Sequence, residues 1–300
     1  MAQSARTFAI ITTCMGRLDH LRASLPRMVG QAAYEVIVVD FSCPQGTGDF
    51  VAANFPSVRV VSVPGERHYS NWKARNAGAF AASSEMLVFA DADTILAEGA
   101  VDRLSKDLPD HVYGFFDRKT SESFNRGGPR VAANQLKGFH VMPAAAFRRV
   151  GGYDEVLEGY ASGADTDMEE RLSMIGLQRH ALDPRIIEKV IEHDAASRTK
   201  HHAHPIRTSY CAGLIYRTAK LCLLRIRSQL ELPLQIRQNL YSAAIEAARS
   251  IGPNRDKIAM NVMVDQEPVL MPRQLGYESG KKTVMLRVEV SLRGKLSEVP

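Results

Sequence analysis

Long apolar runs are absent from this 300-residue chain, although 45% of its residues are hydrophobic. A membrane-spanning helix needs about 20 consecutive, mostly apolar residues, and no stretch of the sequence meets that requirement. The apolar residues 8–11 are too few for the core of a secretory signal peptide, and charged Arg17 and Asp19 follow soon after. We therefore expect no transmembrane helix and a cytoplasmic location.

Cysteine is scarce and scattered. The chain has 4 cysteines, and none forms a Cys-X-X-Cys pair. Such spacing predicts neither a zinc site nor a disulfide framework, and a reducing cytoplasm is the simplest compartment for it. The four positions are Cys14, Cys43, Cys211 and Cys222.

Common phosphate-binding signatures are also missing. No Gly-X-Gly-X-X-Gly follows the first predicted strand and no Gly-Lys-Ser/Thr occurs, which disfavours a dinucleotide-binding domain and a P-loop. The net charge of +5 and the pI near 9.0 are modest. They suit an anionic ligand or an anionic membrane surface, and we expect no nucleic-acid partner.

What the sequence does contain is an alternation of strands and helices. Short apolar segments predict strands, and between them apolar residues recur at helical spacing. This order is typical of right-handed βαβ units around a parallel sheet. The expected strands are residues 7–14, 35–40, 58–63 and 86–90, and the expected helices are residues 17–28, 49–54 and 71–82.

Polar residues stand at the ends of three of these strands: Thr13, Asp40, and the pair Asp91 and Asp93. In open α/β sheets, ligands bind outside the carboxyl ends of the strands, so we expect these residues to share one crevice. Two neighbouring carboxylates are unfavourable unless a cation neutralises them, and a hard divalent ion carrying phosphate oxygens suits such a pair. Taken alone, helix-capping or solvated loop aspartates explain the same pattern.

The second half of the chain continues the alternation with three further strands and a short helix. Gly151 and Gly152 follow that helix, where paired glycines either let the backbone approach a ligand closely or cap the helix. The strands are expected at residues 112–117, 136–142 and 185–191, and the helix at residues 144–150.

Two carboxylates and one histidine complete the set of candidate site residues. Asp165 and Asp167 lie near the start of a helix predicted for residues 166–175, where the positive helix end favours ionised carboxylates. A carboxylate there can act as a general base, or it can simply cap the helix. His193 follows a predicted strand and is either a ligand or a structural, solvated residue.

The last third of the chain differs in character. The segment 210–232 begins at Tyr210, ends at Leu232 and interleaves leucines with arginines and lysines. Such a basic amphipathic helix packs on the main domain or associates peripherally with an anionic membrane, here the inner face of the cell membrane. With a second helix at 234–251 and a strand at 283–292, we expect a main domain of residues 1–205 and a helical C-terminal extension of residues 206–300.

Several short motifs occur in a recognisable order: Thr12-Thr13-Cys14 with Arg17, Val39-Asp40, Ala-Arg-Asn-Ala-Gly at 74–78, and Asp91-Ala92-Asp93. This order resembles GT-A glycosyltransferases of the family-2 type. The stretches 151–155 (Gly-Gly-Tyr-Asp-Glu) and 163–167 (Gly-Ala-Asp-Thr-Asp) resemble acceptor-side motifs of the galactosyltransferase and chondroitin-polymerase branch. The resemblance covers residues 7–200.

The resemblance implies a GT-A fold, a Rossmann-like, mostly parallel sheet flanked by helices. It implies an inverting glycosyltransferase of polysaccharide biosynthesis that moves a sugar from a nucleotide-diphosphate donor, with a UDP-sugar as first candidate. The acceptor would be a hydroxyl of a glycan or a lipid-linked molecule. Mg²⁺ or Mn²⁺ would bind the diphosphate.

The resemblance also implies roles for individual residues. Asp165 would be the catalytic base, and Asp93 and His193 would be metal ligands. The residues expected to bind the nucleotide sugar are Thr13, Arg17, Asp40, Ser42, Arg75, Asn76 and Asp91, and those expected to bind the acceptor are Gly152, Tyr153 and Asp167.

Two departures from the family pattern concern the base contacts and the acceptor. The usual acidic pair or Asp-Gly after the second strand is here Asp40-Phe41-Ser42, and the usual Glu before the catalytic Asp is Ala164. The first departure affects how the nucleotide base is held. The second removes one expected hydrogen bond to the acceptor.

Two other functions fit part of this pattern. A sugar-phosphate nucleotidyltransferase would carry a glycine-rich, basic loop after the first strand, where this chain offers only Gly16 and Arg17. A non-catalytic sugar-nucleotide-binding or membrane-scaffold protein would keep Asp40 but would not need Asp165. The joint presence of Asp93, Asp165 and His193 favours the transferase.

Overall fold

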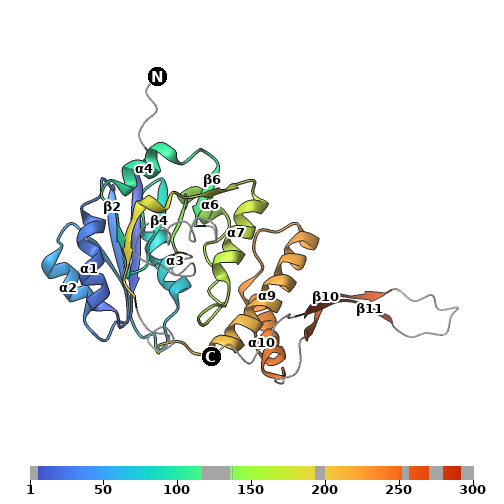
Figure 1. The fold of residues 1–300 in the computed structure, drawn as a ribbon. Coiled ribbons are helices and arrows are strands. Elements are labelled where there is room, and N and C mark those ends of the chain that lie inside the picture. The colour runs from blue at the N-terminus through green and yellow to red at the C-terminus, as the bar shows by residue number, and fades with distance from the viewer. Residues whose placement is uncertain are drawn as a thin grey trace. The chain divides into compact units, whose positions relative to one another are not determined.

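The computed structural model describes residues 6–116, 136, 138–192, 200–251, 257–269 and 280–291. The chain divides into two compact units. Unit 1 comprises Met1–Glu155 and Ala164–Ala203, and unit 2 comprises Val156–Gly163 and His204–Pro300. Figure 1 labels the elements of both units along the chain.

The described part of unit 1 contains a seven-stranded sheet with the strand order β3-β2-β1-β4-β7-β6-β8. Neighbouring strands are parallel except at β7, which is antiparallel to both β4 and β6. The mostly parallel α/β sheet predicted from the sequence is therefore confirmed. The strands are β1 (Phe8–Cys14), β2 (Glu35–Phe41), β3 (Arg59–Val63), β4 (Met86–Phe89), β6 (Val112–Phe115), β7 (His140–Pro143) and β8 (Gln178–Ala181).

Helices flank this sheet (Figure 1), and the described part of unit 1 also contains a small second sheet. The second sheet pairs β5 with β9 in antiparallel fashion. The elements are α1 (Leu18–Val29), α2 (Thr47–Asn54), α3 (Asn71–Ala81), α4 (Ala100–Asp107), α6 (Ala144–Arg149), α7 (Ala164–Met174), the 3₁₀ turn η1 (Pro184–Ile186), β5 (Thr94–Leu96) and β9 (Ile187–Val190).

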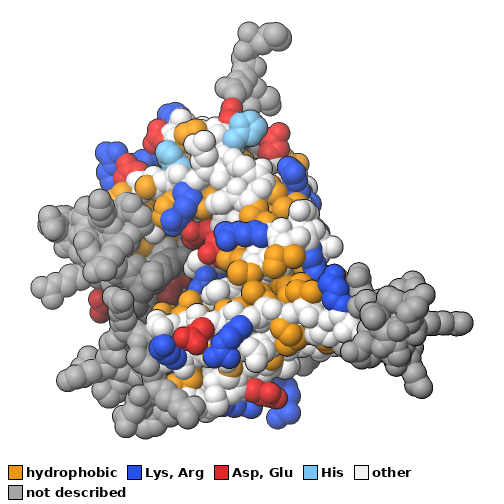
Figure 2. Space-filling view, turned by 90° about the vertical axis from the view of Figure 1, so that its right-hand side faces the viewer, with side chains coloured by type: hydrophobic (Ala, Val, Ile, Leu, Met, Phe, Trp, Pro, Cys, Tyr) orange, Lys and Arg blue, Asp and Glu red, His pale blue; other side chains and the backbone are white. Residues whose placement is uncertain are grey.

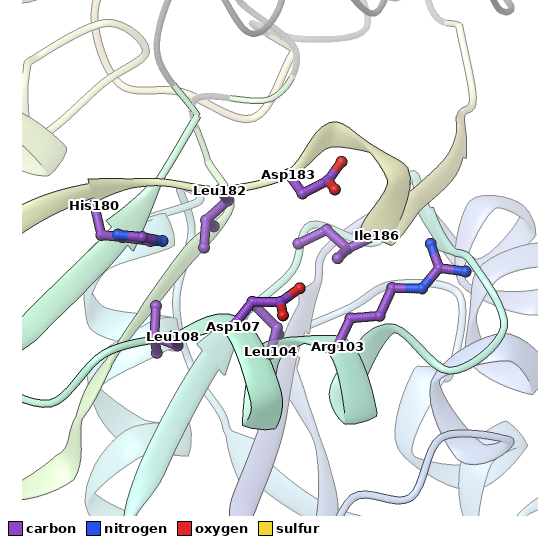
Figure 3. Close-up of a pocket in the computed structure, with 8 residues that line it drawn as sticks. All are labelled: Arg103, Leu104, Asp107, Leu108, His180, Leu182, Asp183 and Ile186. Carbon is purple, nitrogen blue, oxygen red and sulfur yellow. The ribbon is translucent and has the colours of Figure 1, made fainter.

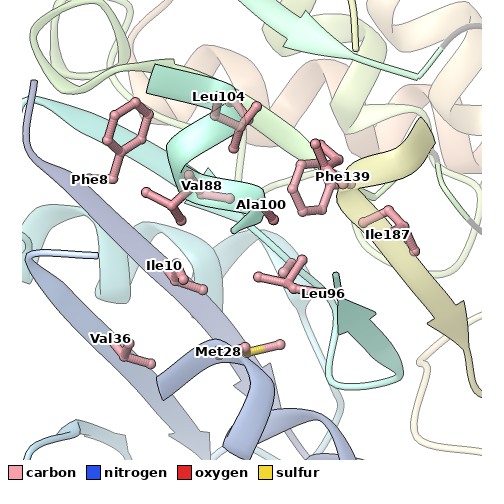
Figure 4. Packing of buried hydrophobic residues seen from close by; sticks show 14 of the residues in the cluster. Phe8, Ile10, Met28, Val36, Val88, Leu96, Ala100, Leu104, Phe139 and Ile187 are labelled. Carbon is pink, nitrogen blue, oxygen red and sulfur yellow. The ribbon is translucent and has the colours of Figure 1, made fainter. Parts of the chain in front are cut away.

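The two faces of the central strands are covered by different helices because successive side chains of a strand point to opposite faces. Ile10 and Val88 share a buried cluster with Met28 of α1 (Figure 4). Ile11 points the other way, toward α3, where a Cβ added to Gly78 would lie 2.6 Å from the Ile11 side chain. Gly78 thus lets α3 approach the sheet closely, which fixes the position of the polar residues on that helix.

The structure differs from the predicted elements mainly in the second half of unit 1. The strand expected at 136–142 begins only at His140, and that expected at 185–191 is divided into η1 and β9. Strand β8 was not predicted, because its sequence, Gln-Arg-His-Ala, is polar and mostly exposed. It lies at the edge of the sheet, where only one neighbour pairs with it.

The described part of unit 2 contains two helices and a two-stranded ribbon: α9 (Ile206–Arg227), α10 (Leu234–Arg249), β10 (Lys257–Val269) and β11 (Gly280–Ser291). The helices pack through an edge-to-face contact between Tyr216 and Tyr241, with ring centroids 5.5 Å apart. β10 and β11 are antiparallel. Most apolar side chains of α9 are buried, and its exposed C-terminal end carries Arg225, Ile226 and Arg227.

Across the described residues, every helix is too short or too polar to cross a bilayer. On the face drawn in Figure 2, Lys and Arg side chains are scattered among acidic and apolar ones. The described residues on that face therefore form no broad basic field of the kind that binds a nucleic-acid backbone.

Candidate active site

The carboxyl ends of three neighbouring strands bring the candidate residues together. In the register of the sheet, Cys14 of β1 lies beside Asp40 of β2, and Ile11 lies beside Phe89 of β4. Thr13, Asp40 and Asp91 therefore stand at one edge, as the alternating pattern of the sequence predicts. This edge is the usual ligand-binding side of an open α/β sheet.

A buried arginine organises the middle of this edge. Arg75 of α3 is only 1% exposed, and its Nη2 lies 2.8 Å from Asp91 Oδ1 and 2.5 Å from the carbonyl oxygen of Gly138. Its guanidinium also lies over the ring of Tyr153, 5.7 Å from the centroid. The Arg75 side chain is shielded from solvent, whereas 36% of the Asp91 side chain is exposed. Arg75 therefore positions the Asp91 carboxylate, and Asp91 is the residue that a ligand can contact.

Asp165, near the start of α7, approaches the same arginine from the other side. Its Oδ1 lies 3.6 Å from Arg75 Nη1 and 3.5 Å from His140 Nδ1, and about a quarter of its side chain (26%) is exposed. Desolvation raises the pKa of Asp165, and the nearby His140 and Arg75 offset part of that rise. A carboxylate with a raised pKa is a stronger base, which suits proton abstraction.

His140 and Glu169 extend this cluster and were not predicted from the sequence. His140 Nε2 lies 3.5 Å from Glu169 Oε1, and Glu169 Oε2 lies 2.9 Å from the Arg179 guanidinium. The Tyr153 hydroxyl lies 3.3 Å from His140 Nδ1. The cluster thus contains a buried imidazole between two carboxylates that are one helical turn apart on α7.

The direction of β7 explains why His140 belongs to the site. His140 pairs with Phe89, the last residue of β4. Because β7 is antiparallel to β4, its first residue stands at the edge where the parallel strands end. From the sequence, a histidine at the start of a strand can be assigned to this edge only when the direction of that strand in the sheet is known.

A second group of polar residues surrounds Thr13. Its hydroxyl lies 2.6 Å from the Tyr69 hydroxyl and 3.1 Å from Asn71 Oδ1. The backbone N–H of Tyr69 donates to the carbonyl of His201, and the His202 ring lies 5.8 Å from the Tyr69 ring. Burial raises the pKa of Tyr69, so the phenol stays protonated and can donate a hydrogen bond.

The histidines 201 and 202 bring a distant segment of unit 1 to this edge. A Cβ on Gly16 would lie 2.5 Å from His201 Nε2, so His201 covers the loop that follows β1. Burial and nearby Arg17 lower the pKa of His202 to about 4, which keeps its imidazole neutral. Sequence reasoning missed both residues because their link to Gly16 and Tyr69 spans most of the chain.

Two of the expected nucleotide contacts hold loops in the described structure. Asp40 Oδ1 accepts from the backbone N–H of Cys43 at 2.9 Å, and Oδ2 accepts from Gly48 N–H at 2.7 Å. The Ser42 hydroxyl donates to the Val63 carbonyl at 2.8 Å. Both residues shape the loop after β2, which lies at this edge of the sheet.

Asn76 clamps the turn that carries Tyr153. Its side-chain N–H donates to the Tyr153 carbonyl at 2.9 Å, and its Oδ1 accepts from the Tyr153 N–H at 2.8 Å. Gly152 has φ of +75°, and a Cβ there would lie 2.6 Å from Asn76 Oδ1. Glycine is therefore required for both conformation and space, and the clamp sets Tyr153 beneath Arg75.

Asp167 points away from this cluster. It is fully buried, and its Oδ2 lies 2.9 Å from Arg171 Nε and 2.6 Å from Nη2. Arg171 also donates to the Val150 carbonyl. This arrangement supports a role in docking α7 rather than in contacting an acceptor.

Comparison with known proteins finds a family that part of the chain resembles. Residues 9–152 match glycosyl transferase family 2, a segment that contains β1, β2, β4 and the Asp91–Asp93 turn. The sequence of this part of the chain is similar to that of glycosyl transferase family 2. No curated protein gives a sequence match.

Solved structures agree with the family-2 assignment at the level of the fold. A mannosyltransferase from Pyrobaculum calidifontis, PcManGT, in complex with GDP-Man and Mn²⁺, superposes with a TM-score of 0.52 at 17% identity, over 83% of this chain and 77% of its own. TarS 1–349 from S. aureus superposes with a TM-score of 0.52 at 13% identity, over 81% of this chain and 71% of its own. The predicted GT-A fold is thereby confirmed.

The family-2 domain offers carboxylates suited to a divalent ion, although the described residues contain no cluster of three His, Cys, Asp or Glu ligands. Asp93 is 9% exposed, and its Oδ2 lies 3.8 Å from Arg17 Nη1. Carboxylate oxygens are the donors that Mg²⁺ and Mn²⁺ prefer, and Mg²⁺ commonly takes few protein ligands together with substrate phosphates. His193 lies outside the described residues; Ile191, two residues before it, donates its N–H to the Asp93 carbonyl at 2.8 Å.

A surface pocket elsewhere in unit 1 has a different character. Figure 3 shows Leu104 of α4 and Leu108, which directly follows α4, facing Leu182 and Ile186 across it, with polar side chains at the rim. None of the candidate site residues lines this pocket. The cluster around Arg75 is therefore the better candidate active site.

Proposed function

We propose that this protein is an inverting glycosyltransferase that moves a sugar from a nucleotide-diphosphate donor, first among them a UDP-sugar, to a hydroxyl of a glycan or a lipid-linked acceptor. The observation that carries the proposal is the Asp165 carboxylate beside Arg75 and His140, at the same sheet edge as Asp91. The family-2 domain supports glycosyl transfer as the reaction class.

In the proposed reaction, Asp165 accepts the proton of the acceptor hydroxyl as that oxygen attacks the anomeric carbon. The bond from the anomeric carbon to the acceptor oxygen forms while the bond to the diphosphate oxygen breaks, so the configuration inverts. Arg75 and His140 oppose the effect of desolvation on the pKa of Asp165 and so favour its ionised form before the reaction. Fixed positioning of both substrates at the sheet edge supplies much of the remaining acceleration.

Asp93 and His193 are the residues we propose as holders of Mg²⁺ or Mn²⁺. When bound, such an ion would neutralise charge on the departing diphosphate. PcManGT, one of the similar structures, is described in complex with GDP-Man and Mn²⁺.

The donor would lie along the edge formed by Thr13, Arg17 and Asp91, and the loop held by Asp40 and Ser42 would border the base. Arg75 would position Asp91, and Asn76 would position Tyr153. On the acceptor side we propose Gly152 and Tyr153, in keeping with the resemblance to the galactosyltransferase and chondroitin-polymerase branch. The burial of Asp167 favours a supporting role for that residue.

A cytoplasmic location with peripheral attachment to an anionic membrane is also part of the proposal. The exposed end of α9 supports it, because Arg225 and Ile226 there combine positive charge with an apolar side chain. A lipid-linked acceptor would be presented at such a surface.

The experiment that tests the proposal is a panel of nucleotide sugars incubated with the protein, Mn²⁺ and candidate glycan acceptors. We expect release of the nucleoside diphosphate from one donor and a product whose anomeric configuration, read by NMR, is opposite to that of the donor. Release of pyrophosphate from a nucleoside triphosphate and a sugar phosphate would instead identify a nucleotidyltransferase. Binding without turnover of any donor would indicate a non-catalytic protein.

A further inference from the structure

Two of the four cysteines meet at the sheet edge, although they are far apart in sequence. Cys14 is the last residue of β1, and Cys43 lies in the loop after β2. The Cys14 thiol forms a hydrogen bond with the Cys43 sulfur. Cys14 is buried, whereas Cys43 is only half-buried and can meet reagents from solvent.

Hydrogen-bond donors converge on the Cys43 sulfur. The backbone N–H of Gly16 donates to it at 3.2 Å, and the backbone N–H of Gln45 and the Cys14 thiol also donate. The Thr47 hydroxyl donates to the Cys14 sulfur at 3.1 Å, so the pair shares one network. The donors to Cys43 stabilise a sulfur anion there, and the hydrogen bond that Cys14 donates keeps the proton on the Cys14 thiol.

The electrostatics agree with this geometry. The Cys14 thiol, followed by the Thr47 hydroxyl and the Gly16 and Gln45 N–H groups, lowers the pKa of Cys43 to about 5 against the opposing effect of burial. The pKa of Cys14 is raised by its hydrogen bond to Cys43 and by burial. The titratable groups near the pair are the Asp40 carboxyl group, whose Oδ1 accepts from the Cys43 backbone N–H at 2.9 Å, and His201. Arg17 contributes a backbone hydrogen bond to Cys14. A thiolate is the reactive form of cysteine, so Cys43 is set up as a nucleophile at neutral pH.

We propose that Cys43 is a thiol modification site and that Cys14 is its resolving partner, so that low-molecular-weight disulfides convert the pair into an intramolecular disulfide. The Cys43 thiolate attacks one sulfur of the small disulfide, whose S–S bond breaks and releases one thiolate. Cys14 then loses its proton and attacks the Cys43 sulfur, which releases the second small thiolate. The two protein sulfurs lose two electrons in total, and the small disulfide gains them.

Oxidation would alter the loops that border the proposed donor site. The Gly16 N–H would lose its anionic acceptor, and the backbone N–H of Cys43 is bound to Asp40 at 2.9 Å. Arg17, next to Gly16, lies 3.8 Å from Asp93. Because these loops border the proposed donor site, we expect oxidation to weaken UDP binding. That expectation rests on the proposed function, whereas the thiol chemistry does not.

The first test is limited alkylation of the full chain with iodoacetamide between pH 6 and 8, followed by peptide mass spectrometry. In the folded protein we expect the Cys43 rate to stay nearly flat over this range, because the thiolate is already formed. In the urea-unfolded chain the same rate should climb about tenfold per pH unit. Cys222 on α9 and the buried Cys211 provide internal comparisons within one digest. Cys14→Ala should restore the steep pH dependence to folded Cys43.

The second test treats the folded chain with oxidised glutathione. We expect a Cys14–Cys43 disulfide with a mass lower by two hydrogens, a stable glutathione adduct at Cys43 in Cys14→Ser, and neither product in Cys43→Ser. A folded-state Cys43 rate with the same pH dependence as in urea, or the absence of the Cys14–Cys43 product, would overturn the proposal. Because these readouts need no glycosyl transfer, they succeed or fail independently of the proposed function.

Discussion

His140 Nδ1 lies 3.5 Å from Asp165 Oδ1, and the other nitrogen of the same ring lies 3.5 Å from Glu169. The imidazole is buried, so this relationship is shielded from solvent and its electrostatic effect on Asp165 is strong. Asp165 also faces Arg75 from α3 and the Asp91 carboxylate beyond it. The balance of these groups decides at which pH the proposed base is ionised.

We predict that His140→Gln moves the acidic limb of the kcat/KM profile to higher pH. Burial already raises the pKa of Asp165 and His140 opposes that rise, so loss of the imidazole raises the pKa further. A base works only when deprotonated, and a higher pKa makes activity fall at a higher pH as the solution is acidified. Transfer rates measured across the pH range for His140→Gln, with His180→Gln on β8 as control, decide the matter. An unshifted limb in His140→Gln would count against the assignment.

We predict that Asp165→Asn keeps the fold and donor affinity but loses turnover by about 10²–10⁴-fold, the usual contribution of a positioned general base. Asp167→Asn should behave in the opposite way. It leaves Arg171 buried beside a neutral partner, which costs about 3–5 kcal/mol of stability. Thermal melting, UDP calorimetry and transfer assays of both variants separate the two roles. Equal effects in the two variants would show that the base lies elsewhere.

We predict that Asp93→Ala and His193→Ala each raise the concentration of Mn²⁺ needed for half-maximal activity. Both side chains would reach one ion, and loss of a ligand weakens metal affinity. Metal titration of the transfer rate is the measurement, and Asp107→Ala, an exposed carboxylate on α4, is the control. If His193→Ala follows the parent curve, His193 is not a ligand.

We predict that Gly152→Ala destabilises unit 1 by about 1–3 kcal/mol, the usual cost of forcing a side chain into left-handed backbone. The residue has φ of +75°, and the added Cβ would collide with Asn76 Oδ1. Because Asn76 clamps Tyr153, a rise in acceptor KM should accompany the lower Tm. Urea titration and acceptor kinetics measure the two effects, and Gly65→Ala, with φ of +83° but open space around it, separates strain from collision.

We predict that Arg225→Ser combined with Ile226→Ser reduces co-sedimentation with vesicles containing anionic lipid. Ile226 is 60% exposed at the end of α9, so the change removes one apolar contact and one positive charge without opening a core. Arg249→Ser, at the end of α10, is the matched charge control. Equal binding by parent and double variant would remove the membrane proposal.

The strands of the first half of unit 1 could be predicted because their apolar runs are short and bounded by polar residues. Residues 86–90 illustrate this: Met86 to Phe89 are all buried in β4, and Asp91 follows at the edge. Strand ends in a parallel sheet meet at one side whatever the details of packing. The positions of Thr13, Asp40 and Asp91 therefore followed from the order of elements alone.

The remainder of the site depends on contacts between distant segments, which periodicity does not encode. His140 could not be assigned without knowing that β7 is antiparallel, and Tyr69 could not be linked to His201 from spacing. The side-chain partners of Asp40 and Asp167 likewise show only in three dimensions. β10 was missed because Met263, which is 56% exposed, breaks the expected alternation of buried apolar and exposed polar residues.

The division of the chain has a practical consequence, because unit 2 cannot be removed with a single cut. The segment Val156–Gly163 belongs to unit 2 and leads directly into α7, which carries Asp165. In unit 2, the Tyr241 hydroxyl donates to the Glu158 carbonyl at 2.9 Å, and a Cβ on Gly213 would lie 1.9 Å from the Ser162 carbonyl oxygen. A chain ended after residue 205 would keep every proposed catalytic side chain but strip the partners from the segment before the base. If such a shortened protein were inactive, the cause could be the loss of support for the segment Val156–Gly163. Point substitutions in the intact chain therefore test the function of residues 206–300 more directly.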